Sequence, residues 1–285
     1  MDIITKYKQA IKPYVPKPSR VIKTVATPEC EKGLKDLIKS LRKHDWKENI
    51  YVYTTTPNWD INWDGVIFKH IPAWWTPGSA IDICRNKPAL IKPELFLDEK
   101  EGTTVLYVDG GDVVFLENPI KLFHLFENSK SILGAYPFKT GRRVCHDHPV
   151  IKALLGEDIW SDRGDYVNNG VIIAKINPLL KMTMKLWKAY LGYTFFAGHW
   201  KIGSKQNRVV GDQEAFNVVR RTLRNFDPTA IYNLPQIWNY RGGEAIKRNL
   251  RPHNGMIHDK EGNKINLVHC SGRGEMPDWI KEMAC

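Results

Sequence analysis

Two aspartates separated by two glycines follow one of the predicted strands. Asp109 and Asp112 come directly after the run 103–108, TTVLYV, which is almost wholly apolar or β-branched. Two neighbouring carboxylates repel each other, and each resists burial unless a cation satisfies it. The intervening glycines let the backbone turn sharply, so both acids can converge on one point. The pattern indicates either a divalent metal with oxygen ligands, Mg²⁺ or Mn²⁺, or a tight turn with solvated acids.

Three further stretches carry polar groups at the borders of predicted elements. They are an Asn-Asn-Gly run before an apolar strand, acids in the first turn of a helix, and a histidine ahead of a Gly-rich basic loop, at 168–170, 211–217 and 269–279. Each has an ordinary explanation, because Asn-Gly is a common turn, Asp caps helices well, and a lone histidine is more often structural than a ligand. The position of His269 after a strand and before the basic loop favours a ligand.

In this order the four stretches resemble the motifs of the retaining GT-A glycosyltransferases, especially the glycogenin and galactosyltransferase-like family eight. That family carries Asp-x-Asp at a strand end, then Asn-x-Gly-Val, Asp-Gln-x-x-x-Asn and His-x-x-Gly-x-x-Lys-Pro-Trp. The corresponding segments here are DGGD at 109–112, NNGV at 168–171, DQEAFN at 212–217 and HCSGRGEMPDW at 269–279. Each motif alone is weak, but four in register form a fairly specific signal over residues 20–279.

The resemblance implies a metal centre and a donor site. Asp109, Asp112 and His269 would hold Mn²⁺ or Mg²⁺, which bridges the two phosphates of a nucleotide-sugar donor, a UDP-sugar. Asp109 would also contact the donor. The other implied donor contacts are Ala26 and Thr27 at the exit of the first strand, where the family holds uracil and ribose, Arg85 and Lys87 on a basic helix, and Gly272 and Arg273 in the last motif.

The resemblance also implies how the sugar is transferred. A nucleoside diphosphate leaves the anomeric carbon, so positive charge builds on the sugar ring while the metal and the basic side chains stabilise the leaving phosphate. Asp212 or Gln213 would lie beside the sugar, although Asp212 could serve only as a helix cap. Asn169 would contact the sugar or the acceptor. Membership of the family would imply retention of the anomeric configuration.

The sequence departs from the family pattern at two of the motifs. Asp109 and Asp112 are separated by two residues and not by one, so the loop either absorbs an extra glycine or leaves one acid outside the metal site. In the last motif Met276 stands at the family's lysine position, and Asp278 interrupts the Pro-Trp pair. Arg273 is the expected substitute for the lysine, because a guanidinium pairs well with phosphate oxygens.

The expected acceptor region is basic and aromatic. Its candidate contacts, in a stretch just before the Asp212 motif, are Trp200, Lys201, Lys205 and Arg208. The whole chain has a formal net charge of +11, which favours an anionic partner. Two acceptor classes stay open: a glycan or lipid-linked glycan, and a polyanion such as modified DNA, whose target base would have to be flipped out.

Strands and helices alternate ahead of the metal motif. Apolar runs predict strands at 20–26, 49–54, 65–69 and 103–108, and helical spacing predicts helices at 31–43 and 81–96. Pro88 and Pro93 should bend or break the second helix. The alternation predicts an α/β fold, which in a GT-A protein is a single Rossmann-like domain, here 21–285, with a mostly parallel sheet and helices on both faces. Ligands should then sit just after residues 26, 54 and 108.

The composition is that of a globular protein, with 285 residues, 42% of them hydrophobic and 26% charged. Residues 1–20, rich in Lys and Pro, are expected to form a basic arm ahead of the domain. Neither a signal-peptide core nor an apolar run near the roughly 20 residues of a transmembrane helix is present, and the five cysteines are scattered. These features predict a cytoplasmic protein without a transmembrane segment.

Two other function classes compete with the transferase. A nucleotidyltransferase would share the sheet and the metal acids, but it should carry a Gly-rich basic loop after the first strand, which VATPECEKG at 25–33 lacks. A nucleic-acid-binding protein without transferase activity would explain the charge and leave Asp109, Asp112, Asp212 and His269 without a reason. Neither alternative accounts for the order of the motifs.

Overall fold

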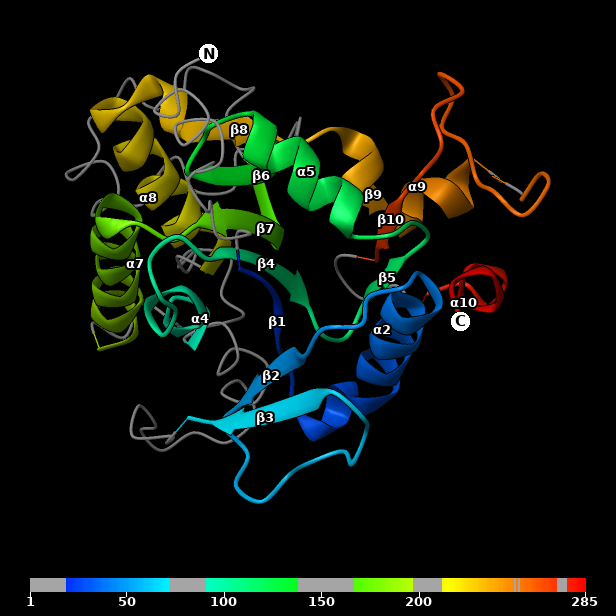
Figure 1. The fold of residues 1–285 in the computed structure, drawn as a ribbon, viewed down its shortest axis with the longest axis horizontal. Coiled ribbons are helices and arrows are strands. Elements are labelled where there is room, and N and C mark those ends of the chain that lie inside the picture. Colours follow the sequence, from blue (N-terminus) through cyan, green and yellow to red (C-terminus); the bar gives the residue numbers. More distant parts are fainter. Residues whose placement is uncertain are drawn as a thin grey trace, which may run out of the picture.

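A seven-stranded mixed sheet forms the centre of the protein, in the strand order β3-β2-β1-β4-β7-β6-β8 (Figure 1). The computed structural model describes residues 19–71, 91–137, 167–196, 212–248, 250, 252–270 and 276–285. The strands of this sheet are β1 Arg20–Val25, β2 Ile50–Thr54, β3 Val66–His70, β4 Thr104–Asp109, β6 Leu133–Pro137, β7 Val167–Lys175 and β8 Ile231–Asn233. Every strand of the sheet except β7 runs in the same direction, so the predicted mostly parallel sheet is confirmed.

Helices cover both faces of the sheet, as predicted (Figure 1). One face carries α4 Glu94–Leu97, α7 Pro178–Phe196 and α8 Asp212–Phe226, and the other carries α2 Glu31–Lys43 and α5 Ile120–Asn128. Successive residues of β4 alternate between the two cores: Tyr107 packs with the first set of helices and Leu106 with the second. A strand buried on both faces must be apolar throughout, which explains the run ahead of Asp109. Among the described residues, no helix is long and apolar enough to cross a membrane.

A second, three-stranded sheet extends from the end of β4. It has the order β5-β10-β9, with β5 Val113–Phe115, β10 Leu267–His269 and β9 Tyr240–Arg241. Its own core includes residues of α9 Gly242–Lys247 and α10 Asp278–Ala284. β10 pairs antiparallel with β5 and places His269 opposite Val113. This register brings His269 to the residue that directly follows Asp112.

The predicted strands up to residue 109 agree with the observed ones to within one residue. Of the helix predicted at 81–96, residues 81–90 lie outside the described residues, and α4 begins directly after Pro93, whose ring cannot be accommodated in a helix interior. The Asn-Asn-Gly run was expected to precede a strand, but Asn168 and Gly170 lie inside β7, whose hydrogen-bonded pairing begins at Val167. His269 likewise ends β10 instead of following it.

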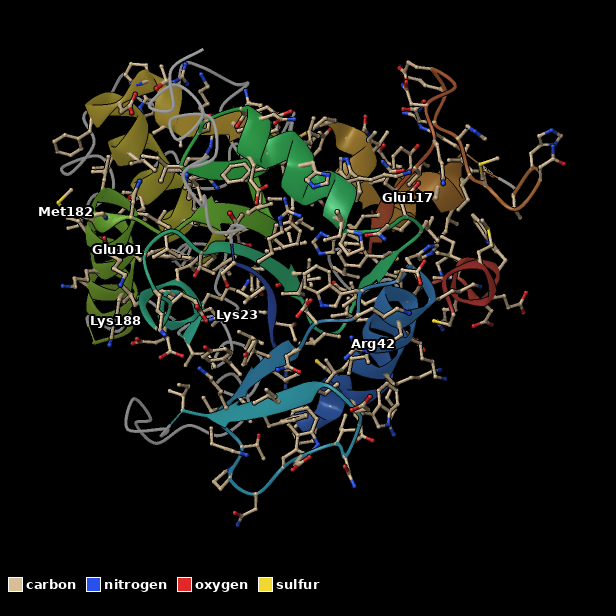
Figure 2. All side chains as sticks on the ribbon, viewed as in Figure 1. Lys23, Arg42, Glu101, Glu117, Met182 and Lys188 are labelled. Carbon is tan, nitrogen blue, oxygen red and sulfur yellow. The ribbon has the colours of Figure 1, made fainter. Side chains whose placement is uncertain are left out.

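A fully buried lysine ties α4 to the central sheet. Nζ of Lys23 in β1 donates to the Tyr53 hydroxyl at 2.9 Å and to the Leu95 carbonyl at 2.7 Å, and it pairs with Glu99 at 2.9 Å. Figure 2 shows Lys23 beside α4. Burial lowers the pKa of Lys23, and the carboxylate of Glu99 opposes that shift. The interaction fixes the segment that also carries Lys92.

Candidate metal centre

The topology of the sheet gathers three strand ends at one edge. The chain leaves β1 toward β2 on one side and returns to β4 on the other, and the register places Val25 of β1 beside Asp109 of β4. Such a switch of strand order opens a crevice at the carboxyl ends of the strands. Because β7 is antiparallel to β4, its first residues, up to Gly170, reach this same edge.

Asp109, Asp112 and His269 converge at this edge. Their ligand atoms all lie within 4.8 Å of one another. Nε2 of His269 is 3.6 Å from Oδ2 of Asp109 and 3.5 Å from Oδ1 of Asp112, which is longer than a good hydrogen bond. Nε2 and Asp112 Oδ1 are both buried and have no hydrogen-bond partner among the described residues. Two carboxylate oxygens and one imidazole nitrogen around a common point form a donor set suited to a divalent cation.

The two glycines of the acidic loop permit this convergence. A Cβ on Gly110 would lie 2.7 Å from both the Thr24 hydroxyl and the Val25 carbonyl oxygen, so the loop lies directly on the end of β1. The carbonyl of Gly111 approaches α2 so closely that a Cβ on Gly33 would be only 2.0 Å from its oxygen. The loop therefore absorbs its extra residue by contact with backbone, and both acids reach the cluster.

The backbone of β7 forms another wall of the cluster. A Cβ on Gly170 would lie 2.1 Å from Cε1 of His269 and 2.7 Å from Oδ2 of Asp109. Real Cβ atoms do not come so close to other heavy atoms. Gly170 is therefore the residue that leaves room for the histidine ring beside the carboxylate.

Lys92 and Tyr107 occupy one oxygen of Asp109. Nζ of Lys92 lies 3.1 Å from Asp109 Oδ1, and the Tyr107 hydroxyl donates to the same oxygen. The lysine also lies 5.1 Å from the centroid of the Tyr107 ring. These contacts leave Oδ2 directed at His269, so Asp109 presents a single oxygen to the cluster.

The charges of the cluster shift the pKa values of its members in opposite directions. Burial lowers the pKa of His269, but the carboxylates of Asp109 and Asp112 outweigh burial and raise it to about 9. Burial raises the pKa of Asp109, but the Lys92 ammonium and His269 lower it well below its usual range. Without a metal the ring is thus an imidazolium between two carboxylates, and a divalent cation would take the place of its proton.

An amide contacts the other nitrogen of the histidine ring. Nδ1 of His269 lies 3.0 Å from Oδ1 of Asn239, which is 2% exposed and follows the 3₁₀ turn η4, Gln236–Trp238. Nδ2 of Asn239 donates to Oδ1 of Asn168 at 3.4 Å. Asn168, which neighbours the predicted site residue Asn169, therefore connects β7 to the cluster.

The remaining predicted site residues are distributed unevenly. Ala26 and Thr27 are buried at the exit of β1, and Asn169 is buried in β7. Asp212 and Gln213 open α8, but their side chains lie outside the described residues. The predicted residues in the undescribed segments are Arg85, Lys87, Trp200, Lys201, Lys205, Arg208, Gly272 and Arg273. The roles of all of these residues stay predictions.

Sequence reasoning missed Lys92, Tyr107 and Asn239, and it gave no role to Asn168 although the Asn-Asn-Gly motif contains it. The period of a strand could have found Tyr107, because residues i and i+2 share a face and Tyr107 precedes Asp109 by two positions. Lys92 and Asn239 gave no such signal. Lys92 lies inside the helix predicted at 81–96, but the resemblance indicated only Arg85 and Lys87 there. Asn239 reaches the cluster only through the pairing of β9 with β10.

A cavity of about 270 Å³ opens beside Asp112. It lies between the first turn of α2, the acidic loop and the start of α10, and Cys30, Gly33, Gly111 and Met276 contribute to its walls. Its charged groups are Glu29, Lys32, Asp36, Asp112 and Lys281. The cavity therefore combines glycines with both acids and amines next to the cluster.

No protein-family model matches the sequence, and neither does any curated protein. Solved structures do match. Mouse xyloside xylosyltransferase 1 in its apo form aligns with a TM-score of 0.52 at 12% identity, over 91% of this chain and 98% of that one. The galactosyltransferase LgtC, in complex with donor and acceptor sugar analogs, aligns with a TM-score of 0.55 at 15% identity, over 92% and 94%. An active-site mutant of LgtC gives 0.55 at 14%, over 93% of each chain.

These identities are low enough that the likeness establishes the fold alone. The chain is a single mixed α/β domain with a mostly parallel seven-stranded sheet, and it shares this architecture with glycosyltransferases over nearly its full length. Because function resides in sites and not in folds, the residues of the cluster must carry any functional argument.

Proposed function

We propose that this protein is a metal-dependent glycosyltransferase that moves a sugar from a UDP-sugar to an acceptor hydroxyl, with retention of the anomeric configuration. The observation that carries the proposal is the convergence of Asp109, Asp112 and His269 at the switch point of the sheet. The likeness in fold to two glycosyltransferases supports the same conclusion independently.

The residues present fit a divalent cation, Mn²⁺ or Mg²⁺. Asp109 Oδ2, Asp112 Oδ1 and His269 Nε2 would be its protein ligands, and the latter two are buried polar atoms without a hydrogen-bond partner among the described residues. A bound cation would neutralise the negative charge that develops on the departing diphosphate. Lys92 holds the second oxygen of Asp109, so that carboxylate keeps its orientation before any donor binds.

The cavity beside Asp112 is the proposed place of the donor's nucleoside. Glu29 and Asp36 can accept hydrogen bonds from ribose hydroxyls, which are donors that carboxylates bind well. Lys32 and Lys281 offer positive charge to an anionic ligand. The further proposed donor contacts are Ala26, Thr27, Arg85, Lys87, Gly272 and Arg273.

The start of α8 is the proposed sugar-binding element. Asn217 of this helix forms two hydrogen bonds to the backbone of Val167, accepting from its N–H at 2.8 Å and donating to its carbonyl at 2.9 Å. These bonds attach α8 to the first residue of β7, three residues before Gly170. This attachment supports the proposal that Asp212, Gln213 and Asn169 contact the transferred sugar.

A glycan is the proposed acceptor. LgtC binds an acceptor sugar analog on the same fold, and no finding favours the DNA acceptor that the net charge left open. The proposed acceptor contacts are Trp200, Lys201, Lys205 and Arg208. The domain boundaries at 1–20 for a basic arm and 21–285 for the transferase domain belong to the same proposal.

The test is a donor-hydrolysis assay, because many transferases slowly transfer the sugar to water and no acceptor need be known. The protein is incubated with a panel of nucleotide-sugars, with Mn²⁺ or with EDTA, and released nucleoside diphosphate is measured. We expect metal-dependent release from one donor, lost in Asp109→Ala and Asp112→Ala and kept in Asp60→Ala, which removes an exposed acid that is not part of the cluster. Absence of both release and Mn²⁺ binding in the wild-type protein would refute the proposal.

A further inference from the structure

A series of hydrogen bonds runs from the backbone of β7 to His269 of the cluster. The N–H of Gly170 donates to Oδ1 of Asn168 at 2.8 Å, and Nδ2 of Asn239 donates to the same oxygen at 3.4 Å. Oδ1 of Asn239 lies 3.0 Å from Nδ1 of His269. The two side chains in this series, Asn168 and Asn239, are amides, in which the nitrogen donates and the oxygen accepts.

The direction of the series is fixed at its backbone end. A backbone N–H can only donate, so the Asn168 atom that faces Gly170 must be the carbonyl oxygen. The Asn239 atom that faces this oxygen must then be the amide nitrogen, which leaves the Asn239 oxygen toward His269. An amide oxygen accepts only, so Nδ1 of His269 must carry a hydrogen.

We propose that Asn239 and Asn168 are positioning residues that select the tautomer of His269 in which Nδ1 carries the hydrogen and the lone pair of Nε2 faces Asp109 and Asp112. This inference rests on the proposed metal site and deepens it. In the other neutral tautomer the Nε2 hydrogen would point at the two carboxylates and block a cation. In the selected tautomer one nitrogen and two carboxylate oxygens present electron pairs to a common point, which a cation satisfies.

The pairing of strands places Asn239 for this role. β9 pairs with β10, with Tyr240 beside Val268 and Arg241 beside His269. Asn239 directly precedes this pair of strands, so backbone hydrogen bonds set its distance from the histidine ring. Both Asn239 and His269 are 2% exposed, and water therefore does not compete for the bond between them.

The first experiment measures Mn²⁺ affinity by calorimetry in four variants of the full chain. Asn239→Leu and Asn168→Leu each remove one amide from the series of hydrogen bonds. Each is expected to weaken Mn²⁺ binding by about 10- to 100-fold, the usual effect of losing a group that orients a metal ligand. Asn239→Asp keeps an acceptor toward Nδ1, and it should stay within about threefold of wild type. Asn263→Leu makes the same change at an exposed position away from the cluster and should bind as wild type does.

The second experiment reads the tautomer directly and does not depend on activity. ¹⁵N NMR of histidine-labelled protein, with the signal assigned through His269→Gln, is recorded with Zn²⁺ as a diamagnetic probe and also without metal at a pH where the ring is neutral. We expect a protonated Nδ1 in wild type and a mixed or reversed tautomer in Asn239→Leu.

The outcomes separate the two proposals. A protonated Nε2 in the neutral wild-type ring would overturn the positioning role, and so would equal Mn²⁺ affinity in wild type, Asn239→Leu and Asn168→Leu. If the wild-type protein binds no metal, the proposed function is refuted. A protonated Nδ1 in that protein, absent in Asn239→Leu, would still support the tautomer selection. Circular dichroism and thermal unfolding of each variant identify any loss that comes from misfolding.

Discussion

Replacing Gly170 by alanine should damage the metal cluster while it leaves the fold in place. The added Cβ would lie 2.1 Å from Cε1 of His269 and 2.7 Å from both Nε2 of His269 and Oδ2 of Asp109. Carbon atoms in contact are about 3.5–4.0 Å apart, so the ring would have to move by about 1.4 Å or more. The ring is buried and held by Asn239, and it cannot move that far without leaving its partners.

Gly170→Ala should lower the stability of the protein much less than it lowers activity. Forcing one carbon into a packed site costs about 1–3 kcal/mol, of which the lower flexibility of alanine in the unfolded chain recovers about 0.5–1 kcal/mol. A protein of this size can remain folded after such a loss. Displacing a catalytic group by about 1 Å costs on the order of 100-fold in rate. We therefore expect donor hydrolysis and Mn²⁺ affinity to fall far more than stability does.

The assay pairs calorimetric Mn²⁺ titration and donor hydrolysis with thermal unfolding. Gly243→Ala is the matched control, because Gly243 lies in α9 and a Cβ there meets nothing within 4 Å. This control should bind Mn²⁺ normally and gain a few tenths to about 1 kcal/mol of stability from its better helix propensity. Unchanged Mn²⁺ affinity in Gly170→Ala would refute the reasoning, because the cluster would then not depend on the space beside β7.

The ion pairs and the metal lead to three further predictions. Lys92→Met should lower the free energy of unfolding by about 1–3 kcal/mol, measured in urea, because Asp109 keeps its charge without its ammonium partner; a variant as stable as wild type would contradict this. Burial raises the pKa of Glu117, but hydrogen bonds from Lys121 and Lys264 outweigh burial and lower this pKa to about 2. The ionised Glu117 side chain therefore stabilises the fold above its unfolded pKa of about 4.5, and this stabilisation is lost as the pH falls toward 2. The stability gap between wild type and Glu117→Gln should therefore be larger at pH 6 than at pH 3, and an equal gap would exclude the ion pairs as its cause. Adding Mn²⁺ at about 100 times its dissociation constant should stabilise the protein by about 2.7 kcal/mol, and EDTA should remove this gain in a thermal-shift measurement; a melting temperature indifferent to both would argue against the site.

The sequence predicted the parts of the structure that local patterns determine. Apolar runs located β1 to β4, and the run is clearest in β4 because that strand is buried on both faces. The alternation with helices indicated the α/β fold. The resemblance to the GT-A family, and not a local pattern, implied that Asp109, Asp112 and His269 meet, and they do.

Other features depend on pairing partners that no local pattern reveals. The direction of β7 is one: its apolar run fits either direction, and only its antiparallel pairing with β4 and β6 brings Gly170 to the cluster. Asn239 is another, because its approach to His269 depends on the register of β9 and β10. The contact of Lys92 with Asp109 is a third, because it depends on how the segment before α4 packs against the end of β4.

The small sheet has a consequence for the order in which the protein assembles. Asp109 and Asp112 lie at the end of a central strand, whereas His269 arrives on β10, which is made after all seven strands of the central sheet. β10 must add to β5 before the third ligand is present, and contacts between residues so distant in the chain form late because closing the long loop costs entropy. The complete metal site would therefore form only at the end of folding. During synthesis the protein would pass through a folded but metal-incompetent stage, in which the two acids are ready and the histidine has yet to be made.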